Sequence, residues 1–477
     1  MTIFIAAAVW IGLIAVFMNS ARPGHVRWRP DPPARRWSLP VTRNPSYTDS
    51  SSRSGMPKQV SVRSTSCRRS RSRGSRPRRH SYWVVLLLGH VMRADIIARV
   101  GAGAVLGVTG LAAITGYVIA RALTAPYVGR RFATRVHGVV AKGGRHYVLL
   151  DDAEQMRRTG LYGAFLPDGA HVRFGAEALS WGSSIARPVE RAEAERLAGV
   201  AYVSWTGIHF PTPSAAGLRA EEIVIPTELG STPAWRVDAG DGDVWAVHIH
   251  GMGSTRAGTL RGVQAAVSSG LTSLIVTYRN TAEGIRHGSG RSTLGLDEAR
   301  DVEPALEYAL AHGARRIVLF GWSMGASIAL QLAHLPRWRE HVVGIVADSP
   351  VLDWRATLEA NCSRAGVPSW SAHLAYPWLT HRLLARTIGL DRALDLDVLD
   401  WTPPGRLKIP LLILQGSADQ STPWQVAAEV AETNPMVGLE LFGADHTMSW
   451  NSDPERWRSG TTDWLLKLLD LIPIPTA

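Results

Sequence analysis

Cysteine is almost absent from this sequence. Its 477 residues include two cysteines, Cys67 and Cys362, which excludes a disulfide framework as the source of stability. Stability must therefore come from a hydrophobic core, and an apolar content of 45% is sufficient for one. The length allows one large domain with appendages, or two to three domains.

Acidic residues are scarce in residues 21–80. This segment holds 16 Lys and Arg residues against two Asp residues, a balance of +14. Because the whole chain carries +12, the remaining residues carry −2. The basic charge is therefore confined to this segment, and we expect no nucleic-acid partner for the remaining residues.

Two interpretations of residues 1–91 stay open. The Arg-, Ser- and Pro-rich composition predicts a disordered arm that binds nucleic acid or anionic lipid. In the interpretation that we favour, translation starts at Met92 and residues 1–91 are upstream sequence. Residues 3–18 are apolar, but they lack the basic n-region and the A-x-A site of a cleaved signal peptide. They are marginal in length for a membrane span.

Charge is also absent from residues 102–120, AGAVLGVTGLAAITGYVIA. With flanking isoleucines the segment extends over residues 96–121, which is long enough to cross a hydrocarbon core about 30 Å thick. Its small residues are typical of transmembrane helices. We expect a single-pass anchor in the cell membrane, with a second span if residues 1–20 insert. A buried helix of a soluble domain is the alternative.

The side of the membrane on which the catalytic domain lies depends on the true start of the chain. Basic residues 21–80 would stay cytoplasmic and send the domain outside. After a start at Met92, the basic residues that follow the anchor would keep the domain inside.

Residues 125–200 predict a small β-rich module. The segment VVAKGGRHYVLL is typical of a hairpin that turns at Gly143 and Gly144. Pro167-Asp168-Gly169 indicates a second turn. The module carries no recognisable site chemistry, so we expect it to serve packing or spacing.

From about residue 200 to residue 477, short apolar segments alternate with helical patterns. The strand candidates are EEIVIP, PAWRVD, VWAVHIHG and residues 271–278, 315–320, 342–347, 410–415 and 437–442. This alternation predicts an α/β domain with a mostly parallel central sheet flanked by helices. Ligands of such sheets bind beyond the carboxyl ends of the strands.

Residues 351–405 interrupt the alternation and are expected to form a helical lid. The segment is rich in aromatic residues: Trp354, Trp370, Tyr376, Trp378 and Trp401. These side chains either line an apolar acyl pocket or form the core of the lid, and we favour the second interpretation.

A nucleophile elbow is predicted at residues 321–325, Gly-Trp-Ser-Met-Gly. The apolar strand 317–320 precedes it, and apolar residues at helical spacing follow it. In such an elbow Ser323 is exposed at the carboxyl edge of the sheet, while Gly321 and Gly325 leave room for neighbouring backbone. The motif alone is weak evidence, and its strand–turn–helix context makes it specific.

A serine nucleophile needs a base, and the base needs an orienting acid. His446 follows the last strand candidate, on the loop FGADHTMSW, and is the predicted base. Asp419 follows the strand 410–415 and is the predicted acid. The rival acids are Asp348 and Asp353, which follow an earlier strand.

Two further features lie beside these residues. Asp445 is adjacent to His446 in the chain and should point away from its Nδ1 atom. Residues 422–425, Thr-Pro-Trp-Gln, resemble a capping box with proline at the first helical position.

Donors for an oxyanion are predicted on two loops. One is the backbone N–H of Met324, and the other is that of Met252, on the loop after VWAVHIHG. Gly251 and Gly253 flank Met252 and allow the backbone to approach a substrate carbonyl. We expect the nearby His248 and His250 to be structural.

The segment H-G-M-G after the third strand, the elbow G-W-S-M-G, Asp419 and the terminal D-H together resemble the α/β-hydrolase fold superfamily. The similarity covers about residues 200–470, and it points to the prolyl oligopeptidase and serine aminopeptidase-like branches and to membrane-anchored actinobacterial hydrolases. Ala326 departs from the pattern, since a third glycine often follows the elbow.

The resemblance implies a serine hydrolase that transfers an acyl group to Ser323 and then to water, without a metal or an organic cofactor. We therefore expect a carboxylic ester hydrolase acting on a small acyl substrate. A peptidase or an acyltransferase on the same triad is the first alternative. The second is a non-catalytic, membrane-tethered scaffold on a hydrolase frame.

Overall fold

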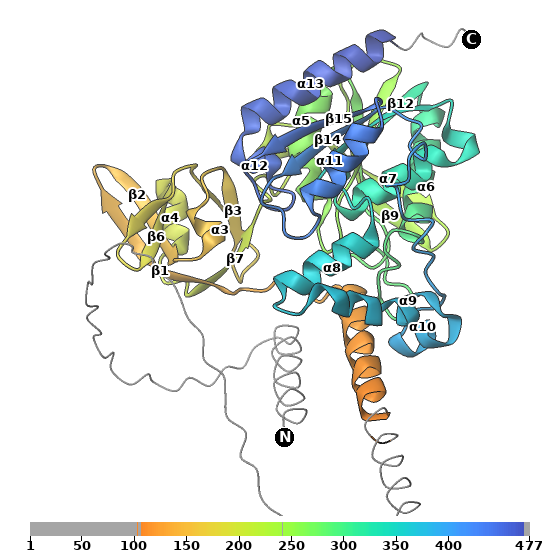
Figure 1. The fold of residues 1–477 in the computed structure, drawn as a ribbon. Helices are drawn as coiled ribbons and strands as arrows, with labels where there is room; N and C mark the ends of the chain where they lie inside the picture. Colours follow the sequence, from red (N-terminus) through yellow and green to blue (C-terminus); the bar gives the residue numbers. More distant parts are fainter. Residues whose placement is uncertain (1–102, 104–105, 241, 472–477) are drawn as a thin grey trace, which may run out of the picture. The chain divides into compact units, whose positions relative to one another are not determined.

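A computed structural model describes residues 103, 106–240 and 242–471 (Figure 1). The residues from Thr109 onward belong to one compact unit. The predictions for residues 1–91, and for the first residues of the expected anchor, lie outside the described residues.

The β-rich module is a seven-stranded antiparallel sheet with the strand order β4-β3-β7-β1-β2-β6-β5. Gly143 and Gly144, with φ of +58° and +77°, form the turn between the first two strands, as the Gly-Gly pair predicts. The elements are β1 (Thr134–Lys142), β2 (Arg145–Asp151), α3 (Glu154–Arg157), β3 (Tyr162–Phe165), β4 (His171–Phe174), β5 (Leu179–Trp181), β6 (Ser184–Val189), α4 (Arg191–Leu197) and β7 (Tyr202–Thr206).

The second domain is built on an eight-stranded sheet with the order β15-β14-β13-β12-β10-β11-β9-β8. The pairs from β11 to β15 are parallel, and β8 and β9 form an antiparallel hairpin at one edge. The strands are β8 (Glu221–Thr227), β9 (Gly230–Val237), β10 (Val244–Ile249), β11 (Thr272–Val276), β12 (Arg316–Trp322), β13 (Val342–Asp348), β14 (Leu411–Gly416) and β15 (Val437–Phe442). The predicted mostly parallel sheet is therefore present.

Helices cover both faces of this sheet (Figure 1). Strand β12 is buried along its whole length. Ile317 and Leu319 pack with the core that includes α6, α7 and α11, whereas Val318 and Phe320 pack with the core that includes α5 and α13. The helices are α5 (Leu260–Ser268), α6 (Glu298–Ala311), α7 (Met324–His334), α11 (Trp424–Thr433), α12 (Ser449–Ser452) and α13 (Pro454–Leu471), with short 3₁₀ turns at η1 (Ser214–Ala216), η2 (Arg256–Thr259) and η3 (Pro336–Trp338).

Residues between β13 and β14 form the predicted helical insertion. It contains α8 (Trp354–Arg364), η4 (Ser369–Leu374), α9 (Tyr376–Thr380) and α10 (Arg382–Ile388). Trp354 and Trp401 are buried in a core that they share with the strands of the sheet, whereas Trp370 is 56% exposed. We call residues 351–405 the lid.

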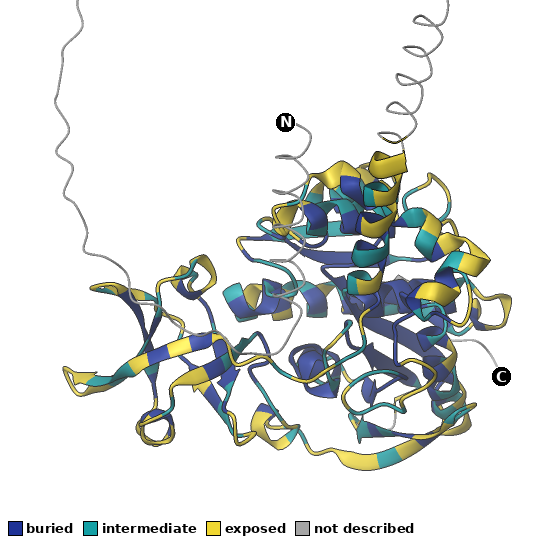
Figure 2. Ribbon diagram, turned by 90° about the horizontal axis from the view of Figure 1, so that it is seen from below, coloured by how far each residue is buried: buried dark blue, intermediate teal, exposed yellow. Residues whose placement is uncertain are grey.

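One helix is apolar and long enough to cross a membrane, Leu106–Leu123. Its first half is exposed: Leu106, Val108 and Ile114 are 72%, 64% and 57% accessible (Figure 2). Its second half packs against the lid. A Cβ atom at Gly116 would lie 1.9 Å from the carbonyl oxygen of Leu374.

The carboxyl end of this helix is fixed to the second domain by Arg291. Its guanidinium donates to the carbonyl oxygen of Arg121 at 2.8 Å and to the hydroxyl of Thr124 at 3.1 Å. Because the last carbonyl groups of a helix lack partners within it, a cationic donor there satisfies them and favours the helix dipole. The helix end is therefore held at one place on the catalytic domain.

The β-rich module contacts the second domain through Asn451, which is fully buried in α12. The amide nitrogen of Asn451 donates to the carbonyl oxygens of Leu161 and Gly207, the latter at 2.9 Å. Its backbone carbonyl accepts from the Leu161 N–H at 2.8 Å. The module therefore packs against the helix that follows the loop of His446.

Candidate active site

The backbone turns sharply between β12 and α7, at Ser323. This residue has φ of +52° and ψ of −117°, a conformation that is strained for a residue with a side chain. A Cβ atom at Gly321 would lie 2.4 Å from Cα of Ala326, and one at Gly325 would lie 2.2 Å from the carbonyl oxygen of Ile249. Only glycine fits at these two positions, which is the geometry expected of a nucleophile elbow.

The structure brings together the three residues that the sequence indicated as nucleophile, base and acid. Nε2 of His446 lies 2.9 Å from Oγ of Ser323, and Nδ1 lies 2.8 Å from Oδ2 of Asp419. Each of the three follows a different strand, β12, β14 or β15, at the carboxyl edge of the sheet. The Asp419 carboxylate is buried, while the imidazole of His446 is 24% exposed.

The carboxylate of Asp419 is surrounded by donors. Oδ1 accepts from the backbone N–H groups of Ser421 and Thr422 at 2.8 and 2.9 Å. Oδ2 accepts from Nε2 of Gln415 at 3.0 Å and from the Thr422 hydroxyl at 2.7 Å, in addition to His446. Burial alone would raise the pKa of Asp419, but the bond and charge of His446 and the Thr422 donors lower it below its ordinary value. Asp419 is therefore ionised at neutral pH.

Gln415 and Thr422 are site residues that the sequence analysis missed. A signal for Gln415 was present, because it is a polar residue inside the apolar strand β14. The capping box predicted for residues 422–425 is wrong. Pro423 is itself the N-cap, and no side chain caps α11. The Thr422 hydroxyl donates to the Asp419 carboxylate and, unlike an N-cap side chain, accepts no backbone N–H of α11.

None of the three neighbouring carboxylates orients the imidazole. Asp348 is buried and accepts from Nε1 of Trp457 at 2.9 Å, and burial raises its pKa. Asp353 caps α8 by accepting from two backbone N–H groups. Asp445 accepts from the backbone N–H of His446 at 2.7 Å, so it lies away from Nδ1.

The loop after β10 lies directly against the serine. A Cβ atom at Gly251 would lie 3.2 Å from Cβ of Ser323, and Gly253 has φ of +68°. Met252 borders the same cavity as Ser323. Met324 is the first residue of α7, where backbone N–H groups have no acceptor within the helix. The role of Met252 and Met324 as oxyanion donors stays a prediction.

His248 and His250 are fully buried beneath this loop. Nδ1 of His250 lies 2.9 Å from the carbonyl oxygen of Gly251, and the ring stacks on Tyr278 with centroids 4.3 Å apart. Burial lowers the pKa of His250 to about 4 and that of His248 to about 3. Both imidazoles are neutral at pH 7, as fits a structural role.

A cavity of about 660 Å³ opens at Ser323. It is bordered by Ser323 and His446, by α8 of the lid and by the carboxyl end of the apolar helix. This volume lies within the range of about 300–1,000 Å³ that is typical of small-molecule sites. The apolar lining residues are Ile119, Ala122, Leu123, Met252, Val351, Trp354, Leu358, Cys362 and Ala365.

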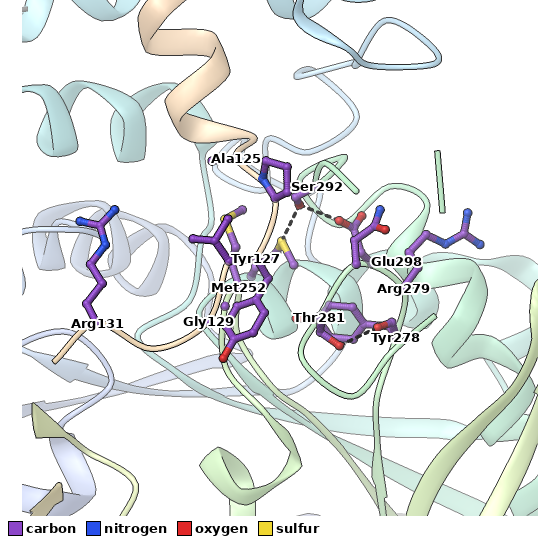
Figure 3. Close-up of a pocket in the computed structure, with 15 residues that line it drawn as sticks. Ala125, Tyr127, Gly129, Arg131, Met252, Tyr278, Arg279, Thr281, Ser292 and Glu298 are labelled. Atoms are coloured by element: carbon purple, nitrogen blue, oxygen red, sulfur yellow. Dashed lines mark hydrogen bonds between the residues drawn. The ribbon is translucent and has the colours of Figure 1, made fainter. Parts of the chain in front are cut away.

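A second cavity, of about 400 Å³, also borders Met252 (Figure 3). Glu298 lies at its edge and accepts from the hydroxyls of Ser292 and Thr293, both at 2.6 Å. The N–H groups of Thr293 and Gly295 also donate to it, each at 3.0 Å. The carboxylate of Glu298 is thus fully engaged and holds the loop that fixes the apolar helix.

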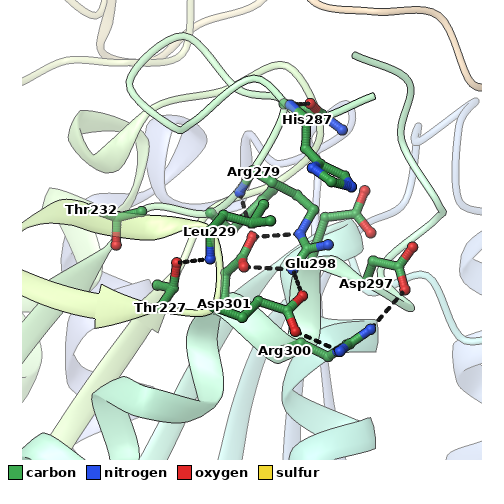
Figure 4. A network of polar contacts seen from close by, with 12 residues as sticks. Thr227, Leu229, Thr232, Arg279, His287, Asp297, Glu298, Arg300 and Asp301 are labelled. Atoms are coloured by element: carbon green, nitrogen blue, oxygen red, sulfur yellow. Dashed lines mark hydrogen bonds and ion pairs between the residues drawn. The ribbon is translucent and has the colours of Figure 1, made fainter. Parts of the chain in front are cut away.

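A buried ion pair holds the segment after β11 on α6 (Figure 4). Nε and Nη2 of Arg279 each donate to the Asp301 carboxylate at 2.7 Å. Glu228 bridges Arg279 and the exposed Arg300. The sequence analysis did not identify this network. Among residues 106–240 and 242–471, no group of three or more His, Cys, Asp or Glu residues is arranged to hold a metal ion.

Comparisons with known proteins give one family. Residues 246–459 match the model of the alpha/beta hydrolase family. A search of curated proteins gave no significant match. The Pyrococcus furiosus esterase Pf2001 is similar in structure, with 22% identity, a TM-score of 0.41 and coverage of 54% of this chain and 94% of its own.

Two further solved structures have comparable sequence identities and TM-scores. Carboxylesterase CesB of Bacillus subtilis has 17% identity and a TM-score of 0.36, over 54% of this chain and 94% of its own. Esterase LipW of Mycobacterium marinum has 22% identity and a TM-score of 0.39, over 54% of this chain and 83% of its own.

Proposed function

We propose that this chain, whose residues 246–459 belong to the alpha/beta hydrolase family, is a membrane-anchored serine esterase. The family match and the sheet topology confirm the predicted fold. The observation that carries the proposal is the pair of contacts made by His446, 2.9 Å to the Ser323 hydroxyl and 2.8 Å to the Asp419 carboxylate.

In the proposed reaction, Nε2 of His446 takes the proton of Ser323 as Oγ attacks the ester carbonyl carbon. Asp419 accepts the Nδ1–H, which keeps Nε2 free to act as a base and stabilises the imidazolium that forms. His446 then gives the proton to the departing alcohol oxygen. A water molecule, activated by the same imidazole, releases the acyl group from Ser323 and regenerates the hydroxyl.

The negative oxygen of each tetrahedral intermediate needs donors that are in place beforehand. We assign this role to the backbone N–H groups of Met324 and Met252. The first lies at the amino end of α7, where the helix dipole also favours negative charge. The second lies on the loop after β10, which can pack close to Ser323 because Gly251 has no side chain.

The membrane anchor is the helix Leu106–Leu123 together with the apolar residues that precede it. Its hydropathy and length are those of a span. Arg291 holds its carboxyl end on the catalytic domain, so the anchor and the active site would move as one body.

The test is hydrolysis of p-nitrophenyl butyrate by the full chain, together with labelling by a fluorophosphonate. Ser323→Ala and His446→Ala are each expected to lower kcat/KM by at least about 10³-fold. Ser327→Ala is the matched control, because Ser327 is buried in the same helix α7 and its hydroxyl has no partner there. It should keep both turnover and labelling.

Turnover in the Ser323→Ala protein would end the acyl-enzyme proposal. Cleavage of peptide anilides in preference to esters would favour the peptidase alternative. Transfer of the acyl group to added alcohols in preference to water would favour the acyltransferase. A folded wild-type chain that is not labelled would favour the scaffold.

A further inference from the structure

The wall of the active-site cavity includes the apolar helix itself. Ile119, Ala122 and Leu123, from the last two turns of the helix, border the same cavity as Ser323 and His446. Trp354 and Leu358, on α8 of the lid, also line this cavity. The helix is therefore part of the substrate site as well as a tether.

The same helix is exposed only a short distance away. Ile114 is 57% accessible, whereas Ile119 is 6% accessible, and the two are separated by about 8 Å along a helix that rises 1.5 Å per residue. Residues 106–110 of this helix are exposed, and Thr115, Gly116, Ile119 and Ala120 are buried. The same helix thus presents an apolar surface outside the cavity, at Ile114, and apolar side chains in the cavity wall, at Ile119, Ala122 and Leu123.

The lid contributes exposed apolar and basic side chains beside this helix. Tyr117 packs edge-on against Trp378 of α9, with centroids 5.2 Å apart. Leu383 on the neighbouring α10 is 59% exposed, between the exposed Arg382 and Arg386. Apolar tips flanked by arginines are typical of segments that lie at a membrane surface with anionic lipid headgroups.

We propose that the substrate is an acyl ester of a membrane lipid, which enters the cavity laterally from the bilayer along the helix 106–123. This inference rests on the proposed function. An acyl chain that follows this surface leaves the bilayer without crossing water, because apolar side chains replace the lipid tails that surrounded it. Its ester carbonyl then meets Ser323 while the chain lies against Ile119, Ala122 and Leu123.

In the reaction, the ester bond between the acyl carbon and the alcohol oxygen breaks. Water supplies the hydroxyl group of the released fatty acid, and the alcohol leaves with a proton. The fatty acid returns to the bilayer along the same apolar wall.

The first experiment uses the wild-type full chain in vesicles of ether-linked phosphatidylcholine, which contains no carboxylic ester. 4-Methylumbelliferyl palmitate is placed either in the vesicles that hold the enzyme or in separate vesicles. We expect at least tenfold faster hydrolysis when enzyme and palmitate share a bilayer. Equal rates would overturn lateral entry and would mean that the ester arrives through water.

The second experiment compares two substitutions on the same helix. Ala122→Trp fills the cavity wall, and we expect the ratio of palmitate to butyrate kcat/KM to fall at least tenfold. Ala113→Trp adds the same group at an exposed position and should change neither rate. Fluorophosphonate labelling checks folding, and Ala122→Leu replaces the larger variant if it does not fold. An unchanged ratio in the folded variant would also overturn the inference.

The failure of this inference and that of the proposed function give different results. Suppose that butyrate hydrolysis depends on Ser323, but that palmitate is hydrolysed no faster in a shared bilayer and Ala122→Trp leaves the ratio of palmitate to butyrate kcat/KM unchanged. The esterase proposal is then supported, and the lipid substrate is refuted. If butyrate hydrolysis persists in Ser323→Ala, both the serine esterase proposal and the lipid substrate are refuted.

Discussion

Replacing Asp419 by asparagine tests most directly the proposed role of Asp419 in orienting the imidazole of His446. The donors around Asp419 decide how the new amide must lie. Oδ1 of Asp419 accepts from two backbone N–H groups, of Ser421 and Thr422, which cannot rotate away. The amide oxygen of the asparagine must therefore occupy the Oδ1 position. Its NH₂ group then occupies the Oδ2 position, 2.8 Å from Nδ1 of His446.

An NH₂ donor at that position forces Nδ1 to accept. The proton of the neutral imidazole must then sit on Nε2, which faces the Ser323 hydroxyl and can no longer take its proton. A wrong tautomer of this kind costs about 10⁴-fold in kcat, which corresponds to about 5 kcal/mol of barrier. The Michaelis constant should change little, because Asp419 does not line the cavity.

The assay is steady-state hydrolysis of p-nitrophenyl butyrate at pH 7.5. Asp353→Asn is the matched control, because Asp353 was the rival acid and asparagine is as good an N-cap as aspartate. The control should retain activity within about twofold, since the cap is preserved. Activity of Asp419→Asn within tenfold of the wild type would refute the assignment of the orienting acid.

Three further predictions concern stability. Gly325→Ala should lower the free energy of unfolding by about 3 kcal/mol in urea denaturation, because the new Cβ would lie 2.2 Å from a carbonyl oxygen of β10. Gly443→Ala, where a Cβ would meet open space, should lower it by less than about 0.5 kcal/mol. Equal losses would contradict the close approach of β10 to the elbow. Arg279→Met should lower the free energy of unfolding by about 3–5 kcal/mol, because it leaves the buried charge of Asp301 without its ion-pair partner. Arg300→Met, at a side chain that is 58% exposed, should lower it by less than about 1 kcal/mol in the same measurement. Burial lowers the pKa of His248 to about 3, so only the unfolded chain binds this proton as the pH falls below about 6.5. Between pH 6.5 and 5 this histidine alone should lower the unfolding free energy by about 2 kcal/mol, so the wild type should lose about that much more than His248→Gln, and equal losses would refute the burial of a neutral imidazole there.

The contacts of Thr422 and Asn451 illustrate what local patterns cannot predict. Thr422 reads as a helix cap in the sequence, but its hydroxyl donates to Asp419. Asn451 lies in an ordinary polar segment, yet it joins the β-rich module to the catalytic domain. The acceptors of Asn451 come from distant parts of the chain. Asp419 is only three residues before Thr422, but the conformation of the loop decides that its carboxylate is the acceptor.

The sequence by itself determined the alternation of strands and helices, the turn at Ser323, and the order along the chain of the proposed nucleophile, acid and base. These features are local, and parallel strands bring their carboxyl ends to one edge, so residues that follow different strands meet there. Only the tertiary structure decided that the apolar helix lines the cavity. Hydropathy predicts that a segment avoids water, but it does not predict whether the segment contacts lipid tails or lines a protein cavity, because both environments are apolar. Packing against residues that are distant in the chain decides between the two.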